Sequence, residues 1–524
     1  TPNISVLNPE NTLYGEIPGL SVLQNGGEPP TNATFFIRGV ETFRDNQPLI
    51  LVDGFERPLS SLSIGEIQNV TVLKDAASLS MYGQRGANGI ILVETKRGEA
   101  DQLRVNASFE TSITEPVGLP SFVQAHTYAE ALNEALLSDG LDRRYSNSDI
   151  DAFSNNSSPV LFPNVNWFDE VLRDQGTRQS FNLTFDGGTS NARYYVLMNY
   201  NSDNGIFGPV NRNEDFSTQL KYGQFNFRSN LDIDISETLA LQINAAGNII
   251  NRNTPSGGGG PEEIFRSLYE IPSAAFPVKT LDGSWGGSPV YGTNPVARLT
   301  STGYGSPNAR ELFLDSRLMK SLDSVTDGLS AEFAISYNNF ASYFEQQTKQ
   351  FSYVSLTPIR DQSGNLIDIE RTEFGEDTEL GFWSSFGNQR RSTDLLGKIR
   401  YETLLENSEL TAVALFHQSG ITIDGQNNTF RRNNFAGNLL YGYDQTYYIN
   451  VAFSYSGNNI LPDNDQYGFF PAVSASWLIT NENFMADNSF IDFLKLRASW
   501  GMTGSDLVPN RNLHLQGFSS GSGY

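Results

Sequence analysis

Apolar and polar residues alternate along most of the chain after Leu103, and this two-residue period limits the folds that the chain can adopt. The clearest example runs from Phe225 to Ile243, where two alternating runs are separated by a short turn. Because successive side chains of a β-strand point to opposite faces, each run predicts a strand with one apolar and one polar face. The apolar positions are Phe225, Phe227, Leu231, Ile233, Ile235, Leu239, Leu241 and Ile243. Such alternation is typical both of a soluble β-sandwich and of a membrane β-barrel.

The connections between the alternating runs favour the barrel. Short connections are predicted near 187–192, 236–238, 322–328 and 405–408, and long ones near 114–178, 202–222, 251–310, 345–390 and 419–435. Short turns at one end and long loops at the other are typical of outer-membrane barrels, whose long loops face the outside of the cell. By alternation we count about thirteen strands. Membrane barrels must close, so we expect further strands after Tyr524.

Composition is consistent with this interpretation and excludes several others. The chain has no apolar run of the length that a transmembrane helix needs, and its mean hydropathy is −0.35. Its 35 basic and 59 acidic residues give a formal charge of −24, which argues against nucleic-acid binding. The absence of cysteine excludes disulfides and thiolate metal sites. Because the chain starts at Thr1 without Met, we expect a mature or truncated product.

A different pattern occupies the stretch from Val70 to Gly98, VTVLKDAASLSMYGQRGANGIILVETKRG. It predicts a strand, a short helix with Asp75 as its N-cap, a glycine-rich turn and a second strand from Ile90 to Thr95. Glycines 83, 86 and 89 recur at three-residue intervals, where a missing side chain permits positive φ or close backbone approach. The glycines follow the helix and lack the GK[ST] ending of a phosphate-binding loop, so nucleotide binding is a poor interpretation. Residues 1–98 are predicted to form a small α/β domain.

At these residues the chain resembles a known family. VLKDAAS, YGQRGANG and IILVETKRG are similar to the end of the plug domain in SusC/RagA-type TonB-dependent outer-membrane transporters. Upstream, LYGEIPGLSV, FIRG and PLILVDG resemble the preceding plug motifs in the same order, and YYINVAFSYSGNN, QYGFFPAVSASW and LKLRASWGMTGS resemble barrel segments. One departure is SGNNILPDND, where the family has an arginine and a DGSS-like loop, so the role of that loop is left open.

The resemblance implies a fold and a function. We expect a transmembrane β-barrel around a small α/β plug. The resemblance implies twenty-two strands for the complete barrel, of which about thirteen would lie in this chain. Residues 1–98 would be the plug without its N-terminus, and 99–524 the first part of the barrel. The family imports an oligomeric nutrient, a glycan or a peptide, across the Gram-negative outer membrane, driven by TonB and covered by a SusD-like surface lipoprotein. The TonB box is expected before Thr1. The alternative is a plugged barrel that serves as a scaffold in a surface or secretion complex and does not transport.

The family motifs supply the candidate site residues. The plug motif and docking residues are Arg38, Gly39, Asp53, Gly54, Lys74, Asp75, Tyr82, Gly83, Arg85, Gly86, Asn88 and Gly89. Their charged members are expected either to fix turns within the plug or to dock it on the polar barrel wall. We expect partly hydrated ion pairs there, contributing roughly 0 to 1 kcal/mol each. The loop aromatics Trp285, Tyr291 and Trp383 are candidates for stacking on a substrate, with loop packing or membrane anchoring as the alternative.

We find no sequence support for enzymatic chemistry, a metal or a cofactor. His126, His417 and His514 are far apart in sequence and belong to no HExxH or GxSxG motif. The acidic run from Asp463 to Asp465 lacks the glycine and the distal glutamate of a calcium loop. In the long loops, a helix is predicted from Thr127 to Leu137 with Gly140 as its stop, and SGGGG at 256–260 is predicted to be mobile or to contact a partner.

Overall fold

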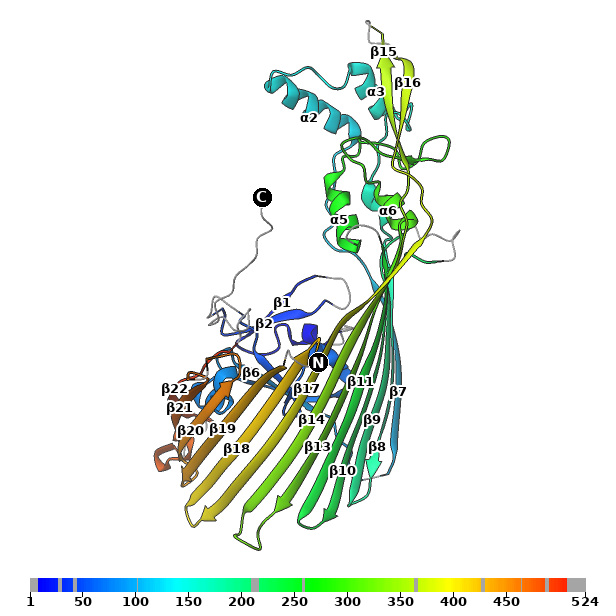
Figure 1. The fold of residues 1–524 in the computed structure, drawn as a ribbon. Coiled ribbons are helices and arrows are strands. Elements are labelled where there is room, and N and C mark those ends of the chain that lie inside the picture. Colours follow the sequence, from blue (N-terminus) through cyan, green and yellow to red (C-terminus); the bar gives the residue numbers. More distant parts are fainter. Residues whose placement is uncertain are drawn as a thin grey trace.

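The structure is a computed structural model that describes residues 8–26, 31–40, 45–100, 102–208, 216–256, 260–361, 366–425, 429–462, 464–485 and 490–506. It consists of a curved wall of long strands, a small domain on the concave side of the wall, and a lobe of helices and short strands at one end (Figure 1). We call these the wall, the plug and the loop lobe. No helix in the described ranges is both long and apolar enough to cross a membrane.

The wall is one antiparallel sheet of thirteen strands, in agreement with the prediction of about thirteen. Its strands follow chain order, and the edge strands β7 and β22 are not paired with each other in the described part of the chain, so the barrel is incomplete over these residues. The strands are β7 Arg104–Thr114, β8 Gly176–Gly188, β9 Ala192–Asn204, β10 Lys221–Ser236, β11 Leu239–Pro255, β13 Gly303–Ser321, β14 Leu329–Thr348, β17 Gly381–Leu405, β18 Ser408–Ile423, β19 Thr429–Tyr443, β20 Tyr447–Asn458, β21 Tyr467–Leu478 and β22 Lys495–Gly501.

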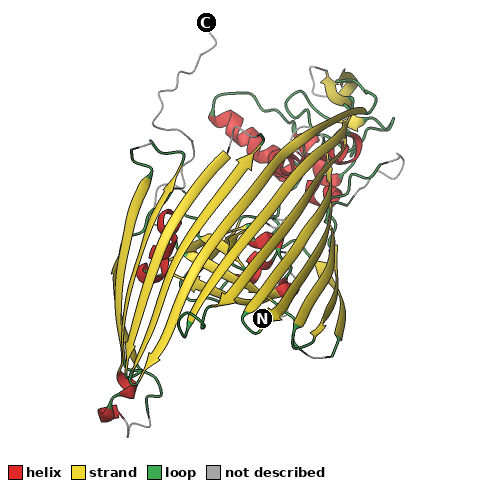
Figure 2. Ribbon diagram, turned by 60° about the horizontal axis from the view of Figure 1, so that its bottom comes forward, coloured by secondary structure: helices red, strands yellow, loops and turns green. Residues whose placement is uncertain are grey.

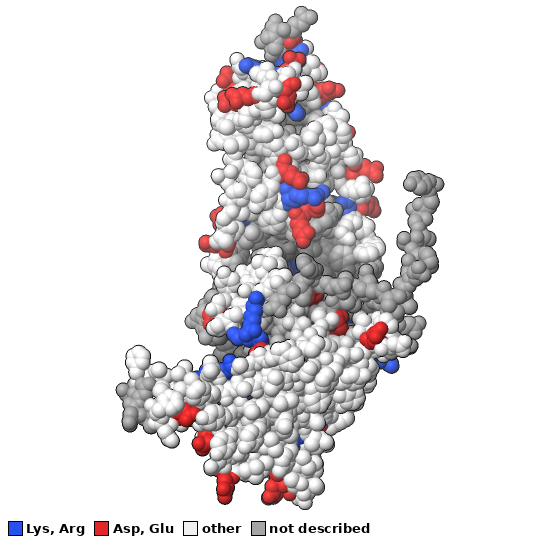
Figure 3. Space-filling model, turned by 90° about the vertical axis from the view of Figure 1, so that its left-hand side faces the viewer, with Lys and Arg blue, Asp and Glu red and all other residues white. Residues whose placement is uncertain are grey.

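The two faces of the wall have the polarity of a membrane barrel. On β10 the polar side chains point inward and are buried, with Asn226 2%, Arg228 1% and Asn230 0% exposed. The apolar side chains point outward, and Phe225 of β10 and Ile249 of β11 stay 37% and 42% exposed. A soluble sandwich would bury its apolar face instead. Figure 3 shows a broad surface with few charged side chains across the strands, as contact with lipid requires.

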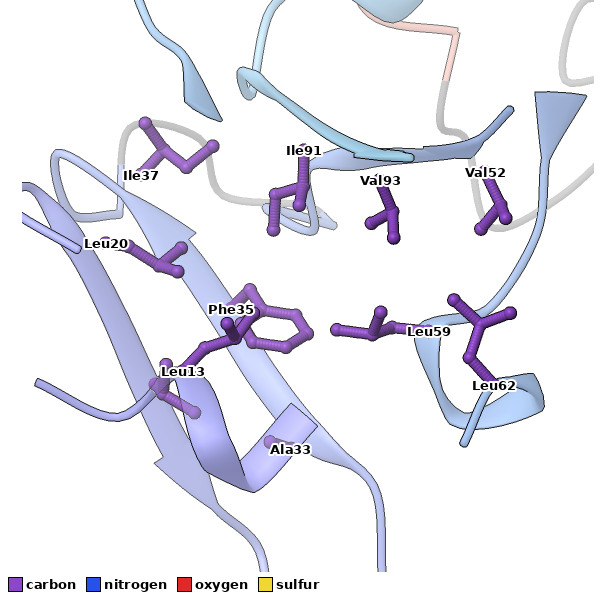
Figure 4. Close-up of a cluster of buried hydrophobic side chains, with 11 residues drawn as sticks. Leu13, Leu20, Ala33, Phe35, Ile37, Val52, Leu59, Leu62, Ile91 and Val93 are labelled. Atoms are coloured by element: carbon purple, nitrogen blue, oxygen red, sulfur yellow. The ribbon is translucent and has the colours of Figure 1, made fainter. Parts of the chain in front are cut away.

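The plug contains two small sheets within the curve of the wall (Figure 2). One pairs β1 Leu20–Gln24 with β2 Ala33–Ile37, and the other has the order β4-β3-β6-β5, with β3 and β6 parallel. Its strands are β3 Leu49–Val52, β4 Phe55–Glu56, β5 Ile67–Leu73 and β6 Ile90–Thr95, and α1 Ala76–Leu79 follows β5. The hydrophobic core includes Phe35, Val52, Leu59 and Ile91, all at most 1% exposed (Figure 4). The predicted order of strand, short helix and strand is therefore correct.

The loop lobe is built from three long connections of the wall and has its own hydrophobic core. Its elements are α2 Ala125–Ser138, α3 Asn147–Asn155, α4 Trp167–Val171, α5 Gly260–Glu270, β12 Trp285–Gly286, α6 Pro295–Ser301, β15 Tyr353–Arg360 and β16 Leu366–Phe374. The helix predicted over Thr127–Leu137 is α2, and Gly140 after it has φ +73°. The core packs α4, α5 and α6 together through residues such as Trp167, Ile264 and Leu299. The lobe lies at the loop end of the wall in Figure 1.

One predicted long connection is wrong. The segment 419–435 is mostly strand, because β18 continues to Ile423 and β19 begins at Thr429. Its outward residues include Arg431 and Asn433, which made the stretch resemble a loop although the two strands remain paired there. These strands extend beyond the apolar band, where outward side chains no longer need to be apolar. The other predicted connections coincide with observed ones, but β13 begins at Gly303 and β17 at Gly381, inside the predicted 251–310 and 345–390, and 209–215 lie outside the described residues.

Candidate functional site at the interface of plug and wall

The plug contacts the wall through polar and charged side chains, which form the candidate functional site. The inward residues of β10 to β14 contact one side of the plug, those of β19 to β21 contact the glycine-rich turn after α1, and β22 contacts α1 itself. In an ordinary domain two packed elements bury apolar side chains against each other. Here many of the facing side chains are polar, so hydrogen bonds and ion pairs form much of the contact, beside a few apolar residues such as Leu197 and Phe313.

Arg228 of β10 anchors one side of the plug. Its guanidinium forms an ion pair with Glu66 of the plug, and its Nη1 lies 3.6 Å from Asp53 Oδ2. Glu66 is held by the backbone N–H of Ser63, in a capping box that closes the turn before β5. Asp53 in turn accepts hydrogen bonds from the backbone N–H of Thr95, at 3.0 Å, and from its hydroxyl, at 2.8 Å. The wall arginine thus joins two plug carboxylates that are already fixed by the plug's own fold.

A second buried ion pair joins Arg57 of the plug to Asp315 of β13. Arg57 Nη2 also donates to Asn338 Oδ1 at 3.2 Å and to Ser336 Oγ at 3.3 Å, and the guanidinium lies 4.7 Å from the ring centre of Phe313. The side chains of Arg57 and Asp315 are 1% and 3% exposed. This pair and Arg228–Glu66, which lie outside the residues predicted from the sequence, are almost fully buried, whereas the predicted Arg85 pairs with Glu56 in a partly exposed contact. Losing one partner of a buried pair leaves a buried charge, which costs about 3–5 kcal/mol.

The glycine-rich turn fits against the opposite part of the wall. Gly83 has φ +53° and ψ −120°, and a Cβ there would collide with Ser456 Oγ of β20. The next residue, Gln84, donates its backbone N–H to Ser456 Oγ at 3.0 Å and accepts from Asn458 Nδ2 at 2.9 Å. The predicted roles of the glycines agree with this geometry, since a Cβ at Gly86 would lie 2.6 Å from the Leu79 carbonyl oxygen, and Gly89 has φ +80°.

Four charged groups meet beside this turn. Arg85 Nη2 lies 2.7 Å from Glu56 Oε1 of the plug, and Arg432 of β19 pairs with Asp506 and approaches Glu56 Oε2 at 3.6 Å. Burial raises the pKa of Glu56, but Arg85 and Arg432 outweigh that effect and hold its pKa below the ordinary value of 4.5. Glu56 therefore remains a carboxylate that links the plug to β19 at neutral pH.

The other candidate residues from the sequence divide between wall contacts and internal roles. Asp75 caps α1 and lies 3.4 Å from Arg497 of β22, and the Asp53 carbonyl beside Gly54 accepts from Arg317 of β13 at 2.9 Å. Lys74 donates to the Pro18 carbonyl at 2.9 Å, and Asn88 to the Asp45 carbonyl at 2.9 Å, both within the plug.

Among the described residues, Arg38 and Gly39 also show no contact with the wall, and Tyr82 packs inside the plug. Arg38 is exposed at φ +62° beside Gly39 at φ +102°, and no side-chain contact between Arg38 and the wall is found among the described residues. Tyr82 packs on a small cluster with Leu79 and Ile90, where burial raises its pKa. A docking role for Arg38 stays a prediction.

Three ion pairs of the interface were not predicted from the sequence: Arg57–Asp315, Arg228–Glu66 and Arg97–Asp232. Arg97 at the end of the plug lies 2.6 Å from Asp232 of β10 and 3.3 Å from Asn244 of β11. A usable signal was present, because Arg228, Asp232 and Asp315 are charged residues at inward positions of alternating strands. Such positions meet the lumen in a barrel.

The loop aromatics lie in different surroundings. Trp285 and Tyr291 are partly buried against the core of the loop lobe, and Lys279 lies 4.3 Å from the Trp285 ring centre. Trp383 of β17 is 54% exposed beside Phe344. A substrate role stays a prediction for all three. Among the described residues no group of His, Asp and Glu is placed to hold a metal ion, and Asp463, His514 and 257–259 lie outside those residues.

Comparison with known proteins identifies relatives of both parts. Residues 3–90 match the family model of the TonB-dependent Receptor Plug Domain. The chain is 25% identical, over 95% of its length, to TonB-dependent receptor P26 of Formosa agariphila, of which it covers 50%. It is 24% identical, over 96% of its length, to TonB-dependent receptor SusC of Bacteroides thetaiotaomicron, of which it also covers 50%. The chain thus spans about half the length of the curated relatives it matches.

Solved structures show the same fold. The RagAB peptide importer in its closed-closed state aligns with a TM-score of 0.75 at 17% identity, covering 98% of this chain and 60% of that one. Its open-open state aligns with the same TM-score. All of these relatives are named as receptors or importers and none as an enzyme. The plug and the thirteen wall strands therefore have the arrangement of a TonB-dependent barrel.

Proposed function

Because the chain is a SusC/RagA-type TonB-dependent receptor, we propose that the whole protein imports an oligomeric nutrient across the Gram-negative outer membrane, driven by TonB. The plug, which we assign to residues 1–98, closes the lumen at rest. A pull from the periplasm displaces or remodels it, and the nutrient then passes between the plug and the wall. The remainder, 99–524, forms the first part of the barrel.

The observation that carries this proposal is the polarity of the contact between plug and wall. Arg228, Glu66, Arg57 and Asp315 lie on facing surfaces that water can hydrate once they separate. A plug that was to stay fixed would gain more from apolar packing, because replacing buried ion pairs with well-packed apolar residues is often stabilising. Ion pairs seal the lumen at rest, and hydration offsets part of their loss when the plug moves.

We assign the partner surface to the loop lobe. It stands at the loop end of the wall and carries exposed apolar side chains such as Tyr269, Leu281 and Val290. A SusD-like lipoprotein would bind there, since the turns at the other end, such as 237–238 and 406–407, have too few residues for an ordinary interface. The substrate would be an oligopeptide or an oligosaccharide. The relative RagAB is named a peptide importer, which supports the first class.

A reversible thiol lock tests whether the plug must move. The chain has no cysteine, so Thr95→Cys in the plug together with Asn230→Cys in β10 introduces the only two thiols of residues 1–524. In the unmodified protein, Asn230 Nδ2 donates a hydrogen bond to Thr95 Oγ1 at 2.9 Å. The control lock, Thr422→Cys with Thr429→Cys, joins β18 to β19 and leaves the plug free. The hydroxyl oxygens of these two threonines lie 2.9 Å apart.

The readout is depletion of peptides from a protein hydrolysate, or of oligosaccharides from a polysaccharide hydrolysate, by cells that carry the full-length protein and its partner. Mass spectrometry of the medium follows both classes. We expect the oxidised plug lock to stop depletion, a reductant to restore it, and the control lock to have no effect. Depletion that continues with a locked plug would refute import by plug displacement. No depletion by the unmodified protein would instead favour the scaffold function.

A further inference from the structure

The outer face of the wall carries a hollow that the transport function does not use. The hollow has a volume of about 230 Å³ and lies where Gly247 of β11 leaves a gap between two apolar side chains. Phe227 of β10 is the direct cross-strand partner of Gly247 on one side, and Leu312 of β13 is its partner on the other. Phe225 and Ile249 form the next pair toward the loop lobe. These side chains all belong to the apolar, outward set.

An arginine lies at the rim of this hollow nearer the loop lobe. Arg310 of β13 is the cross-strand partner of Ile249, shares the outward face with Leu312, and lines the hollow. Its guanidinium donates to the Ile250 carbonyl at 3.0 Å, the Ala309 carbonyl at 2.8 Å and Asn251 Oδ1 at 3.1 Å. No carboxylate pairs with it in the part of the chain that the structure describes. Neutral acceptors therefore hold an uncompensated positive charge at the edge of the apolar band.

We propose that this hollow binds one phosphorylated, acylated lipid of the outer leaflet. An acyl chain would fill the gap over Gly247, against Phe227, Ile249 and Leu312, and a phosphate would bind Arg310. The chemistry at each end fits, since Phe225, Phe227, Ile249 and Leu312 supply most of the lining, beside the polar Asn248, Glu311 and Asn339, and guanidinium groups bind phosphate through paired hydrogen bonds. The vertical order also fits, because Arg310 is level with Ile249 and lies on the loop-lobe side of Gly247 and Leu312, toward the headgroups of an outer leaflet. This inference rests on the outer-membrane location proposed above.

A second exposed arginine of the wall, Arg431, serves as a control that distinguishes a specific site from a general attraction of anionic lipid to positive charge. Arg431 of β19 is also exposed on the outward face, four residues toward the loop lobe from the apolar Phe435. It is four wall strands away from β13 and does not line this hollow. If positive charge alone attracted the lipid, Arg431 and Arg310 would contribute equally.

Native mass spectrometry of the purified full-length protein tests the proposal without any transport. A diphosphorylated, multiply acylated glycolipid and the same lipid after removal of its phosphates are titrated separately. We expect the phosphorylated lipid to bind one copy more tightly. Arg310→Ala is expected to weaken that copy about tenfold, the size of a lost charged hydrogen bond, with no change for the dephosphorylated lipid. Arg310→Lys should restore part of the preference, and Arg431→Ala should behave as the unmodified protein.

The hollow itself is tested by filling it. A Cβ at Gly247 would lie 2.9 Å from the Glu311 carbonyl oxygen, so a substitution there could disturb the strands. Leu312→Trp fills the gap from the side and should weaken both lipids. Equal binding of the two lipids, an unchanged Arg310→Ala variant, or an equal loss in Arg431→Ala would each overturn the site. Inorganic phosphate that binds as tightly as the glycolipid would also overturn it, because the acyl chain would then contribute nothing.

Discussion

The two faces of the same strands have opposite properties. On the inside of β10, Arg228 and Asn230 are buried against the plug and bound by its polar groups. On the outside, Phe225 and Ile235 of the same strand stay exposed. Specific partners stabilise the inner face, whereas the apolar band of the outer face has the polarity of a surface that faces lipid, where a charge is costly. The same substitution should therefore have different consequences on the two faces.

The largest effect is expected from removing the buried arginine of the inner face. Arg228→Ala leaves Glu66 and Asp53 buried without their counter-charge, which should destabilise the contact between plug and wall by about 3–5 kcal/mol. Hydrogen exchange of the full-length protein should show faster exchange of the β5 amides while β18 and β19 remain protected. Arg104→Ala, which breaks the exposed pairs with Glu99 and Asp186, is the control and should leave β5 unchanged. Equal exchange in both variants would remove the distinction between buried and exposed pairs.

A charge on the outer face should have the next largest effect. Ile243→Arg introduces a guanidinium within the apolar band of β11, at a cost of about 2–4 kcal/mol near the middle of the membrane. Gln242→Arg, one residue away and facing the lumen, is the matched control and should be better tolerated. The fraction of folded, heat-modifiable barrel in lipid vesicles measures both variants. A larger loss in Gln242→Arg would reverse the assignment of the faces.

The glycine-rich turn offers a smaller test of the inner face. Gly83→Ala meets Ser456 Oγ and also strains a backbone at φ +53° and ψ −120°, and such strain costs about 1–3 kcal/mol. Protease protection of the plug in the full-length protein should fall. The double variant Gly83→Ala with Ser456→Gly separates the two causes. Ser456→Gly alone is the reference, because it removes the acceptor of the Gln84 N–H. Protection of the double variant equal to that reference would attribute the loss to contact with Ser456, and lower protection would attribute it to the backbone or to Ser454 Oγ, 2.8 Å from the added Cβ.

The smallest effect is expected from pH. The pKa of Glu56 is lowered in the folded protein, so its ionised form stabilises the plug above pH 4.5, and this contribution is lost as the pH falls below that value. Proteolysis of the plug in the full-length protein should therefore increase below pH 4.5. Glu56→Gln should remove part of this increase while raising susceptibility at neutral pH. An identical pH profile in the variant would show that Glu56 is not coupled to the plug.

The sequence was informative where the structure depends on local rules. Alternation identified the strands, and three-residue glycine spacing identified a turn in which Gly83 and Gly89 do adopt positive φ. The pairing of Glu66 with Arg228 could not be predicted, because it depends on the curvature of the wall and the position of the plug within it. The loop lobe escaped prediction for a similar reason, since its core joins residues from distant connections, such as Trp167 and Leu299. The extent of β18 and β19 was underestimated because polar outward residues resemble a loop.

The central claim is that ion pairs between the wall and the plug keep the lumen closed. Single-channel conductance of the full-length protein in a planar bilayer tests it most directly. Glu66→Gln with Asp315→Asn removes one carboxylate from each of the two buried pairs while nearly preserving side-chain volume. We expect brief openings and a raised leak compared with the unmodified protein, and no such change in the control Glu99→Gln with Asp186→Asn. A double variant that stays as tightly closed as the unmodified protein would contradict the account.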